Sequence, residues 1–167
     1  MNISIKQNGW IRIAVKIAVL ALSLWIIFGL CFGLHRMNGV GMAHRIEDGD
    51  LVLYSRLVDA YAADDPVLFE YDGEVYLSSI LALPGDLIEI DERGCLRVNG
   101  VQVSDDIVYN LEQDETPDFS TPYLVPNGSY FVLNENLESM EDSRSFGAIW
   151  AKDIKGKVVG ILRTRSV

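Results

Sequence analysis

The 167-residue sequence is poor in the side chains that bind metals or form disulfides, with two cysteines and two histidines. Cys31 falls inside a long apolar run and Cys95 lies far beyond it, so a disulfide framework is not expected. No CxxC pair accompanies His35 or His44, so a structural zinc site is not expected either. We therefore expect a fold that holds neither a metal nor another cofactor.

Acidic side chains are absent from the beginning of the chain, and Glu47 is the first of them. From Asn38 onward, 24 acidic residues stand against 10 basic ones, a net charge of −14 with histidine neutral. Nucleic acids recruit lysine and arginine to their phosphates, so this acidic body excludes nucleic acid as an expected partner.

Charge of either sign is missing from Ile17 to Leu34, which reads IAVLALSLWIIFGLCFGL. About 20 apolar residues are needed to cross the hydrocarbon layer of a bilayer, and Ile13–Val15 can extend this run. A cleaved signal peptide is the alternative, but its apolar core has only about 7–15 residues. The sequence therefore favours an uncleaved anchor that crosses the membrane once.

The basic residues predict the orientation of this anchor. Lys6, Arg12 and Lys16 precede the apolar run, whereas Arg36 alone follows it closely. Because cytoplasmic flanks carry the excess of lysine and arginine, the N-terminus is expected in the cytoplasm. The predicted organisation is a cytoplasmic N-terminus at residues 1–12, a transmembrane signal-anchor helix at 13–34, and an extracytoplasmic domain at 35–167 of a cell-membrane protein.

The body alternates short apolar runs with turn signals, a pattern typical of β-strands. Asp72-Gly73 between two such runs predicts a hairpin with a type I′ turn, and Arg93-Gly94 and Asn99-Gly100 mark further turns. Residues 104–126 are acidic and interrupted by three prolines, so we expect an insertion or loop there. The predicted fold class is mainly β, behind one N-terminal transmembrane helix.

Four stretches of the body occur in the order and spacing of the conserved boxes of type I signal peptidases. They are GMAHRIEDGDLVLYSR (41–56), DPVLFEY (65–71), YLSSILALPGD (76–86) and NENLESMEDSRSFG (134–147). The chain, including its N-terminal anchor, resembles this family of membrane-bound serine proteases, the S26 peptidases. The resemblance implies a signal-peptidase-type β domain that works at the outer face of the membrane.

The chain departs from the family pattern where the chemistry is expected. A Ser–Lys protease needs a hydroxyl to attack the carbonyl and a neutral amine to accept its proton. The resemblance places Gly41 at the nucleophile and Ser78 at the base, and neither can take that role. Met140 stands in place of a serine in the last box. We therefore predict a pseudo-peptidase without the dyad, which is not an enzyme.

The resemblance divides the candidate residues into two groups. The expected peptide-binding cleft consists of Gly41, Met42, Ser78, Ser79 and Met140. The expected structural residues are Gly49, Asp50, Pro84, Gly85, Asp86, Asp142, Ser143 and Arg144. Among these, Asp142 and Arg144 are expected to form an ion pair that braces the wall of the cleft.

The departures resemble those of signal-peptidase-like proteins that assist pilus assembly in streptococci. This resemblance implies that the chain helps to assemble sortase-linked pili. The expected partners are pilin precursors or their signal peptides, with the pilus sortase as a further partner. An extended peptide would add as a strand to an edge of the sheet, where backbone hydrogen bonds hold it.

Two alternatives remain open from the sequence. In the first, the chain is an active hydrolase in which Ser78 or Ser79 is the nucleophile and His44 is the base. In the second, the chain has a docking role in the membrane, through its acidic face or through residues 104–126.

Overall fold

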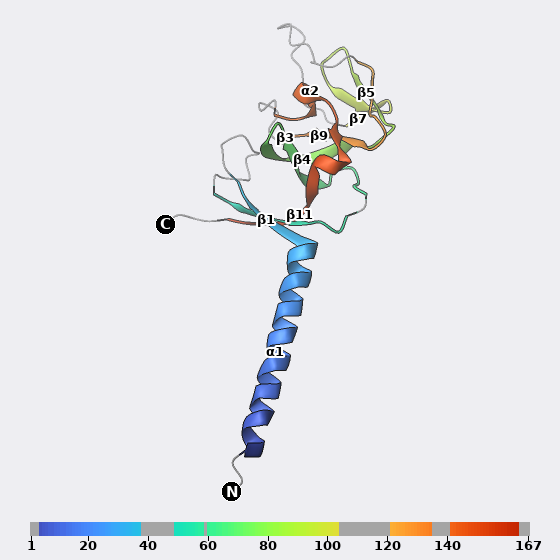
Figure 1. Ribbon diagram of the computed structural model, residues 1–167. Coiled ribbons are helices and arrows are strands. Elements are labelled where there is room, and N and C mark those ends of the chain that lie inside the picture. The colour runs from blue at the N-terminus through green and yellow to red at the C-terminus, as the bar shows by residue number, and fades with distance from the viewer. Residues whose placement is uncertain (1–3, 38–48, 59, 104–120, 135–140, 164–167) are drawn as a thin grey trace.

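The computed structural model describes residues 4–37, 49–58, 60–103, 121–134 and 141–163. Figure 1 shows one long helix that leads directly into a domain built mostly of strands. The elements are α1 (Ser4–Cys31), β1 (Phe32–Arg36), β2 (Leu51–Ser55), β3 (Pro66–Tyr71), β4 (Glu74–Ala82), β5 (Leu87–Ile90), β6 (Leu96–Val98), β7 (Val101–Gln102), β8 (Tyr123–Leu124), β9 (Ser129–Leu133), α2 (Ser143–Phe146), β10 (Ile149–Trp150), the 3₁₀ turn η2 (Ala151–Asp153) and β11 (Ile154–Leu162). The mainly β fold class with one N-terminal apolar helix is confirmed.

Helix α1 contains a stretch, Gly9–Cys31, that is long and apolar enough to cross a membrane. The helix ends at Cys31, whereas the sequence predicted a transmembrane helix over residues 13–34. Phe32, Gly33 and Leu34 belong instead to β1, because this strand pairs antiparallel with β2. An apolar run alone does not separate the last turn of a helix from a strand that follows it without a break.

A curled sheet of seven strands forms the body next to α1, in the order β1-β2-β11-β3-β4-β9-β10. All of its pairs are antiparallel. The predicted hairpin is present between β3 and β4, and its turn residues Asp72 and Gly73 have φ of +50° and +82°. Two successive positive φ values are those of the type I′ turn that the Asp-Gly pair predicted.

A second sheet of four strands, β7-β6-β5-β8, lies at the end of the domain far from α1 (Figure 1). Asn99-Gly100 makes the predicted turn between β6 and β7, with φ of +52° and +78°. The loop predicted over residues 104–126 falls largely outside the described residues. At its end the structure differs, because Tyr123 and Leu124 form β8 and the next residue, Val125, is buried.

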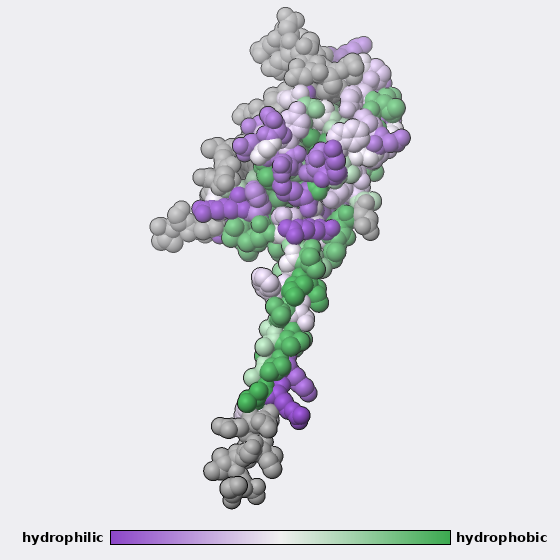
Figure 2. All heavy atoms as spheres, in the orientation of Figure 1, coloured by the Kyte–Doolittle hydropathy of each residue, from purple (hydrophilic) through white to green (hydrophobic). Residues whose placement is uncertain are grey.

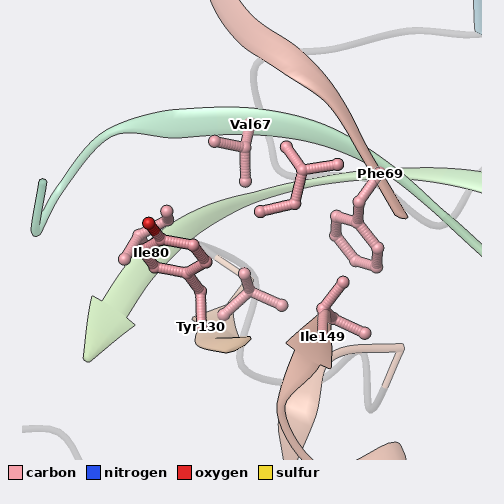
Figure 3. Close-up of a cluster of buried hydrophobic side chains, with 7 residues drawn as sticks. Val67, Phe69, Ile80, Tyr130 and Ile149 are labelled. Atoms are coloured by element: carbon pink, nitrogen blue, oxygen red, sulfur yellow. The ribbon is translucent and has the colours of Figure 1, made fainter. Parts of the chain in front are cut away.

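Three hydrophobic clusters form the core of the described domain. The largest packs side chains from β3, β4, β9, β10 and β11 inside the curl of the large sheet; Figure 3 shows Val67, Phe69, Ile80, Tyr130 and Ile149 converging there. A second cluster joins the two sheets through Ala82, Ile88, Leu96, Val125 and Phe131. The third lies under β1, β2 and β11, close to the end of α1.

Candidate functional site

The first candidate residue, Ser78, lies on β4 and is almost completely buried. Its hydroxyl donates a hydrogen bond of 2.6 Å to Oδ1 of Asn134. The register explains this contact. Ser79 pairs with Leu133 in an antiparallel ladder, so Ser78 lies opposite Asn134, and the two side chains share one face of the sheet. Ser78 is thus held at the end of β9 by a neutral amide oxygen.

Asn134 is itself fixed by the last sequence box. Its backbone N–H donates to Oδ2 of Asp142 at 2.9 Å, and its Nδ2 donates to the carbonyl of Glu141 at 3.2 Å. The amide therefore has one orientation, with its oxygen directed at the hydroxyl of Ser78. Sequence reasoning included Asn134 only as the first residue of the last box and missed this contact.

Asp142 and Arg144 form the predicted ion pair, and both side chains are completely buried. Nε and Nη2 of Arg144 donate to the two carboxylate oxygens of Asp142, each at 2.8 Å, in the fork geometry that favours such pairs. Asp142 also accepts from the backbone N–H of Arg144 and so caps the short helix α2. With the bond from Asn134, both carboxylate oxygens are fully engaged.

The same turn supplies hydrogen-bond acceptors to a strand edge. Strand β9 pairs with β10 only at Ser129 and Tyr130, so its later N–H groups need other partners on that side. The N–H of Val132 donates to Oγ of Ser143, and the N–H of Asn134 donates to Asp142. The side chains of Asp142 and Ser143 therefore accept hydrogen bonds from this edge of the sheet beyond the point where β10 ends.

The motif Leu83-Pro84-Gly85-Asp86 makes the turn that links the two sheets. The N–H of Asp86 donates to the carbonyl of Leu83 at 3.0 Å, and Gly85 has φ of +88°, as a type II turn requires at that position. The carboxylate of Asp86 accepts from the N–H of Leu83 and from Nδ2 of Asn99. Pro84, Gly85 and Asp86 are therefore structural residues in the described domain.

The remaining predicted residues fall into two groups. Gly49, with φ of +91°, and the buried Asp50 form the entry to β2, where they exchange backbone hydrogen bonds with Met37. Gly41, Met42, His44 and Met140 lie outside the described residues. The distance between Gly41 and Ser78 is therefore not described, and the cleft stays a prediction. Ser79, next to Ser78 on β4, is half-buried.

Aromatic side chains gather near the last box, around Phe146 of α2. Tyr71 stacks on Phe146 with ring centroids 4.2 Å apart, and Phe69 and Tyr76 lie against the same ring. Burial raises the pKa of Tyr76, and the charge of Glu141 raises that pKa further. The tyrosine is therefore neutral at physiological pH and acts as a packing residue.

Within the described ranges, no group of three or more His, Cys, Asp or Glu side chains is placed to hold a metal ion. Cys31 and Cys95 are both free thiols, as expected from their separation in the sequence. Among the described residues, the groups that meet at Ser78 and Asn134 are a hydroxyl, an amide and a carboxylate.

One junction was not predicted at all. Arg56, just after β2, donates its backbone N–H to the carbonyl of Cys31 at 2.8 Å and its Nη1 to the carbonyl of Gly29 at 3.2 Å. Its guanidinium also lies over the ring of Tyr54, 5.5 Å from the centroid. Gly33 leaves room for this ring, because a Cβ there would come within 2.1 Å of Tyr54 Cζ. The junction fastens the end of α1 to the sheet.

An apolar N-terminal helix joined without a break to a curled β domain fits a single-pass membrane protein. The family described as "Signal peptidase, peptidase S26" matches residues 8–162, which include both the helix and the domain. The chain belongs to the signal peptidase family, peptidase S26.

Similar proteins are found in species of Bacillus and Enterococcus. "Signal peptidase I V" of Bacillus subtilis is 29% identical, over 92% of this chain and 97% of that protein. "Signal peptidase I" of Bacillus licheniformis is 30% identical, over 90% of this chain and 87% of that protein. A crystal structure of a signal peptidase I from Enterococcus faecalis matches with 24% identity and a TM-score of 0.46, covering 61% of this chain and 99% of that chain. The family assignment does not rest on this structural match.

These relatives correct one prediction. The sequence was interpreted as a pseudo-peptidase that is not an enzyme, and this is wrong, because the chain belongs to an enzyme family and its relatives are named signal peptidases. The prediction relied on matching two positions, Gly41 and Ser78, to a dyad. Gly41 lies outside the described residues, so no geometry of the site supports the loss of catalytic groups.

Proposed function

We propose that the chain acts as a signal-peptidase-type protein on exported precursors at the outer face of the cell membrane, and that pilin precursors are its substrate class. The match of the family to residues 8–162, helix and domain together, carries this proposal. The choice of pilins rests on the resemblance of the sequence boxes to pilus-assembly proteins. The apolar helix and the family fit a single-pass membrane protein.

The proposed orientation places the β domain outside the cell. Arg12 and Lys16 stand on the N-terminal side of the uncharged part of α1, and the acidic body follows its C-terminal end. The positive-inside rule then puts the N-terminus in the cytoplasm. A precursor that emerges from the membrane meets the β domain on this side, close to the end of its own signal peptide.

We propose an edge of the large sheet as the surface that receives the precursor. Among the described residues, the sheet ends at β10 on one side and at β1 on the other. Strand β10 has two residues, whereas β1 has five and starts immediately after the membrane helix. An extended peptide can pair with an exposed edge through its backbone, so β1 offers the longer template at the membrane surface.

The described residues also limit which group performs the hydrolysis. A serine nucleophile needs a base that accepts its proton. The hydroxyl of Ser78 donates a hydrogen bond to the amide oxygen of Asn134, which is not a base, and both side chains are buried. Ser78 is therefore better suited to hold Asn134 than to attack a peptide bond. Ser79 is the other serine named as a candidate on β4. Replacing it tests the alternative that the nucleophile belongs to this strand.

The proposal is tested by binding of a precursor to the full-length chain in lipid vesicles. The ligand is a pilin precursor with its signal peptide, and its matched control is the same pilin without that peptide. We expect vesicles that contain the chain to retain more uncleaved precursor than vesicles without it, and no retention of the control. Equal retention of both ligands, or of neither while the precursor stays at full length, would contradict recognition of the signal-peptide region.

The pilus sortase is the second proposed partner. It would be tested in the same vesicles, by asking whether the sortase is retained in the absence of any precursor. Retention only in the presence of the precursor would indicate that the pilin bridges the two proteins. This result would leave the precursor as the direct partner of the chain.

A further inference from the structure

Two turns of the described domain place an asparagine before a glycine. Asn99-Gly100 joins β6 to β7, and Asn127-Gly128 lies between β8 and β9. In such a pair the backbone nitrogen of the glycine can attack the side-chain amide carbon of the asparagine, because a glycine has no Cβ to shield this nitrogen. The two atoms must first come into contact, so the surroundings of each asparagine decide whether the reaction proceeds.

The side chain of Asn99 is held at both ends of its amide. Its Oδ1 accepts a hydrogen bond of 2.9 Å from the N–H of Leu87, and its Nδ2 donates one of 2.8 Å to Oδ1 of Asp86. The backbone N–H of Asn99 also donates to the carbonyl of Leu87 at 2.8 Å. A ring formed with Gly100 would expel Nδ2, which the fold uses as a donor, and would have to form while the amide is restrained.

Asn127 lies in an exposed turn that does not use its side chain. The N–H and Oγ of Ser129 close this turn by donating to the carbonyl of Pro126 at 3.2 and 2.8 Å. The carbonyl of Gly128 accepts from the N–H of Ala151 at 2.8 Å. Within the described ranges, neither the side-chain amide of Asn127 nor the N–H of Gly128 has a hydrogen-bond partner. No hydrogen bond there has to break before the two groups meet.

The space around the attacking nitrogen is open. Gly128 has φ of +78°, and among the described residues other than its chain neighbours, no heavy atom lies within 4 Å of the position that a Cβ would occupy. Asn127 and Gly128 are both exposed. Figure 2 shows hydrophilic side chains gathered over the domain, whereas the helix is mostly hydrophobic. An exposed turn of the domain therefore meets water, which is the second reactant.

We propose that Asn127 is a site of spontaneous deamidation in the folded chain and that Asn99 is protected from the same reaction. The backbone nitrogen of Gly128 bonds to the amide carbon of Asn127, the bond from that carbon to Nδ2 breaks, and Nδ2 leaves as ammonia with the proton of the glycine N–H. Water then opens the succinimide ring at either carbonyl and leaves aspartate or isoaspartate. The reaction uses neither a precursor nor an enzyme, so it is independent of the function proposed above.

Deamidation changes both the charge and the backbone of this turn. Either product adds a negative charge, and isoaspartate also inserts the side-chain methylene into the backbone between Pro126 and Ser129, whose hydrogen bonds close the turn. Ser129 is the first residue of β9 and pairs with Trp150 of β10. The modified turn therefore lies at the start of the strand that leads to Asn134.

The test incubates the full-length chain in detergent micelles at mildly alkaline pH, in parallel with the same chain in guanidinium chloride. Peptide mapping by mass spectrometry follows each asparagine separately, because a carboxyl group replaces the amide and changes the mass of the peptide. Methylation by protein isoaspartyl methyltransferase identifies the isoaspartate product. Asn99 is the matched control within the same molecule, since the glycines that follow Asn99 and Asn127 both have φ of +78°.

We expect Asn127 to deamidate in the folded chain at least about tenfold faster than Asn99, whose amide is restrained by two hydrogen bonds. In guanidinium chloride the two rates should be similar. Equal rates in the folded chain would overturn the proposal. The same preference for Asn127 in guanidinium chloride would also overturn it, because the local sequence and not the fold would then set the rates.

The variant Asn127→Gln provides a second measurement. It lengthens a side chain that has no hydrogen bond within the described ranges, so the fold should be retained. We expect the isoaspartate signal of the folded variant to fall several-fold, while the rate at Asn99 stays the same. An isoaspartate signal of unchanged size would place the main reaction elsewhere in the chain and would contradict the assignment to Asn127.

Discussion

Asp142 and Arg144 show at the scale of single residues how the last box stabilises the domain. Both side chains are completely buried and joined by two hydrogen bonds. We expect Asp142→Ala to lower the free energy of unfolding by about 3–5 kcal/mol, because the buried guanidinium of Arg144 loses its carboxylate partner. The measurement is chemical denaturation of the full chain in detergent micelles, followed by tryptophan fluorescence.

The matched control for this prediction is Lys155→Met, which breaks an ion pair with Glu70 at the surface. The side chains of that pair are 32% and 49% exposed, and exposed pairs contribute about 0–1 kcal/mol. Equal losses for Asp142→Ala and Lys155→Met would contradict a structural role for the buried pair.

Ser78 gives a second prediction at this scale. Ser78→Ala removes a buried hydrogen bond to Oδ1 of Asn134. We expect a loss of about 0.5–1.5 kcal/mol of unfolding free energy, the net contribution of a typical intramolecular hydrogen bond. Catalytic turnover per folded molecule is expected to stay unchanged. Abolition of turnover with unchanged stability would instead assign the nucleophile to Ser78.

The sequence predicted the roles of single residues only where a motif fixes local geometry. Asp142 and Arg144 are two positions apart, so their pairing follows from a short turn that the resemblance already identified. The contact between Ser78 and Asn134 joins residues 56 positions apart and depends on the register of β4 against β9. No local pattern specifies that register, so the role of Asn134 was missed.

At the scale of elements, Asp65 and Lys157 join the beginning of β3 to β11. Burial acts to raise the pKa of Asp65, but hydrogen bonds from Lys157 and from the N–H of Ala62 outweigh it, and the net pKa is lowered. A carboxyl with a lowered pKa in the folded state stabilises the fold above its ordinary value of 3.8. This contribution is lost as the pH falls from about that value through the lower pKa of the folded state.

We therefore expect Asp65→Asn to reduce the stability of the chain at neutral pH and to make it less dependent on pH below about 4. The measurement is the free energy of unfolding across the acid range for both proteins. The two curves should converge at the lowest pH. A constant difference between them at every pH would show that the charge of Asp65 does not contribute.

The junction of α1 with β1 and β2 gives another prediction for elements. We expect Gly33→Ala to cost about 1–3 kcal/mol, because the added methyl group would meet the ring of Tyr54 and displace it. Gly160→Ala is the matched control, since nothing lies within 4 Å of its Cβ position. Equal effects on thermal unfolding would contradict close packing at the junction, and recovery by Tyr54→Leu would support it.

Elements with strong turn signals could be predicted from the sequence, whereas the shortest strands could not. The β3–β4 hairpin follows from Asp72-Gly73, because positive φ at both positions favours these residue types. Strand β1 was missed because its residues continue the apolar run of the membrane helix. Strand β8 was missed because two residues show no periodicity, and only the burial of Val125 indicates that this segment packs on the core.

At the scale of the whole molecule, an apolar helix and a curled β domain are joined where Arg56 donates hydrogen bonds to the carbonyls of Gly29 and Cys31. The order of the boxes along the chain predicted this architecture, because the described part of each box makes a strand, a turn or a short helix of the same domain. The catalytic status could not be predicted in this way. It depends on atoms brought together from distant positions, and Gly41 is not among the described residues.

The most direct test of the central claim is the mass of a pilin precursor after incubation with the full-length chain in lipid vesicles. A member of the signal peptidase family is expected to remove the signal peptide, so the account predicts a product shortened at the junction with the mature pilin. Vesicles without the chain serve as the control. A precursor that stays at full length under conditions in which it is retained by the chain would contradict peptidase activity and leave only recognition.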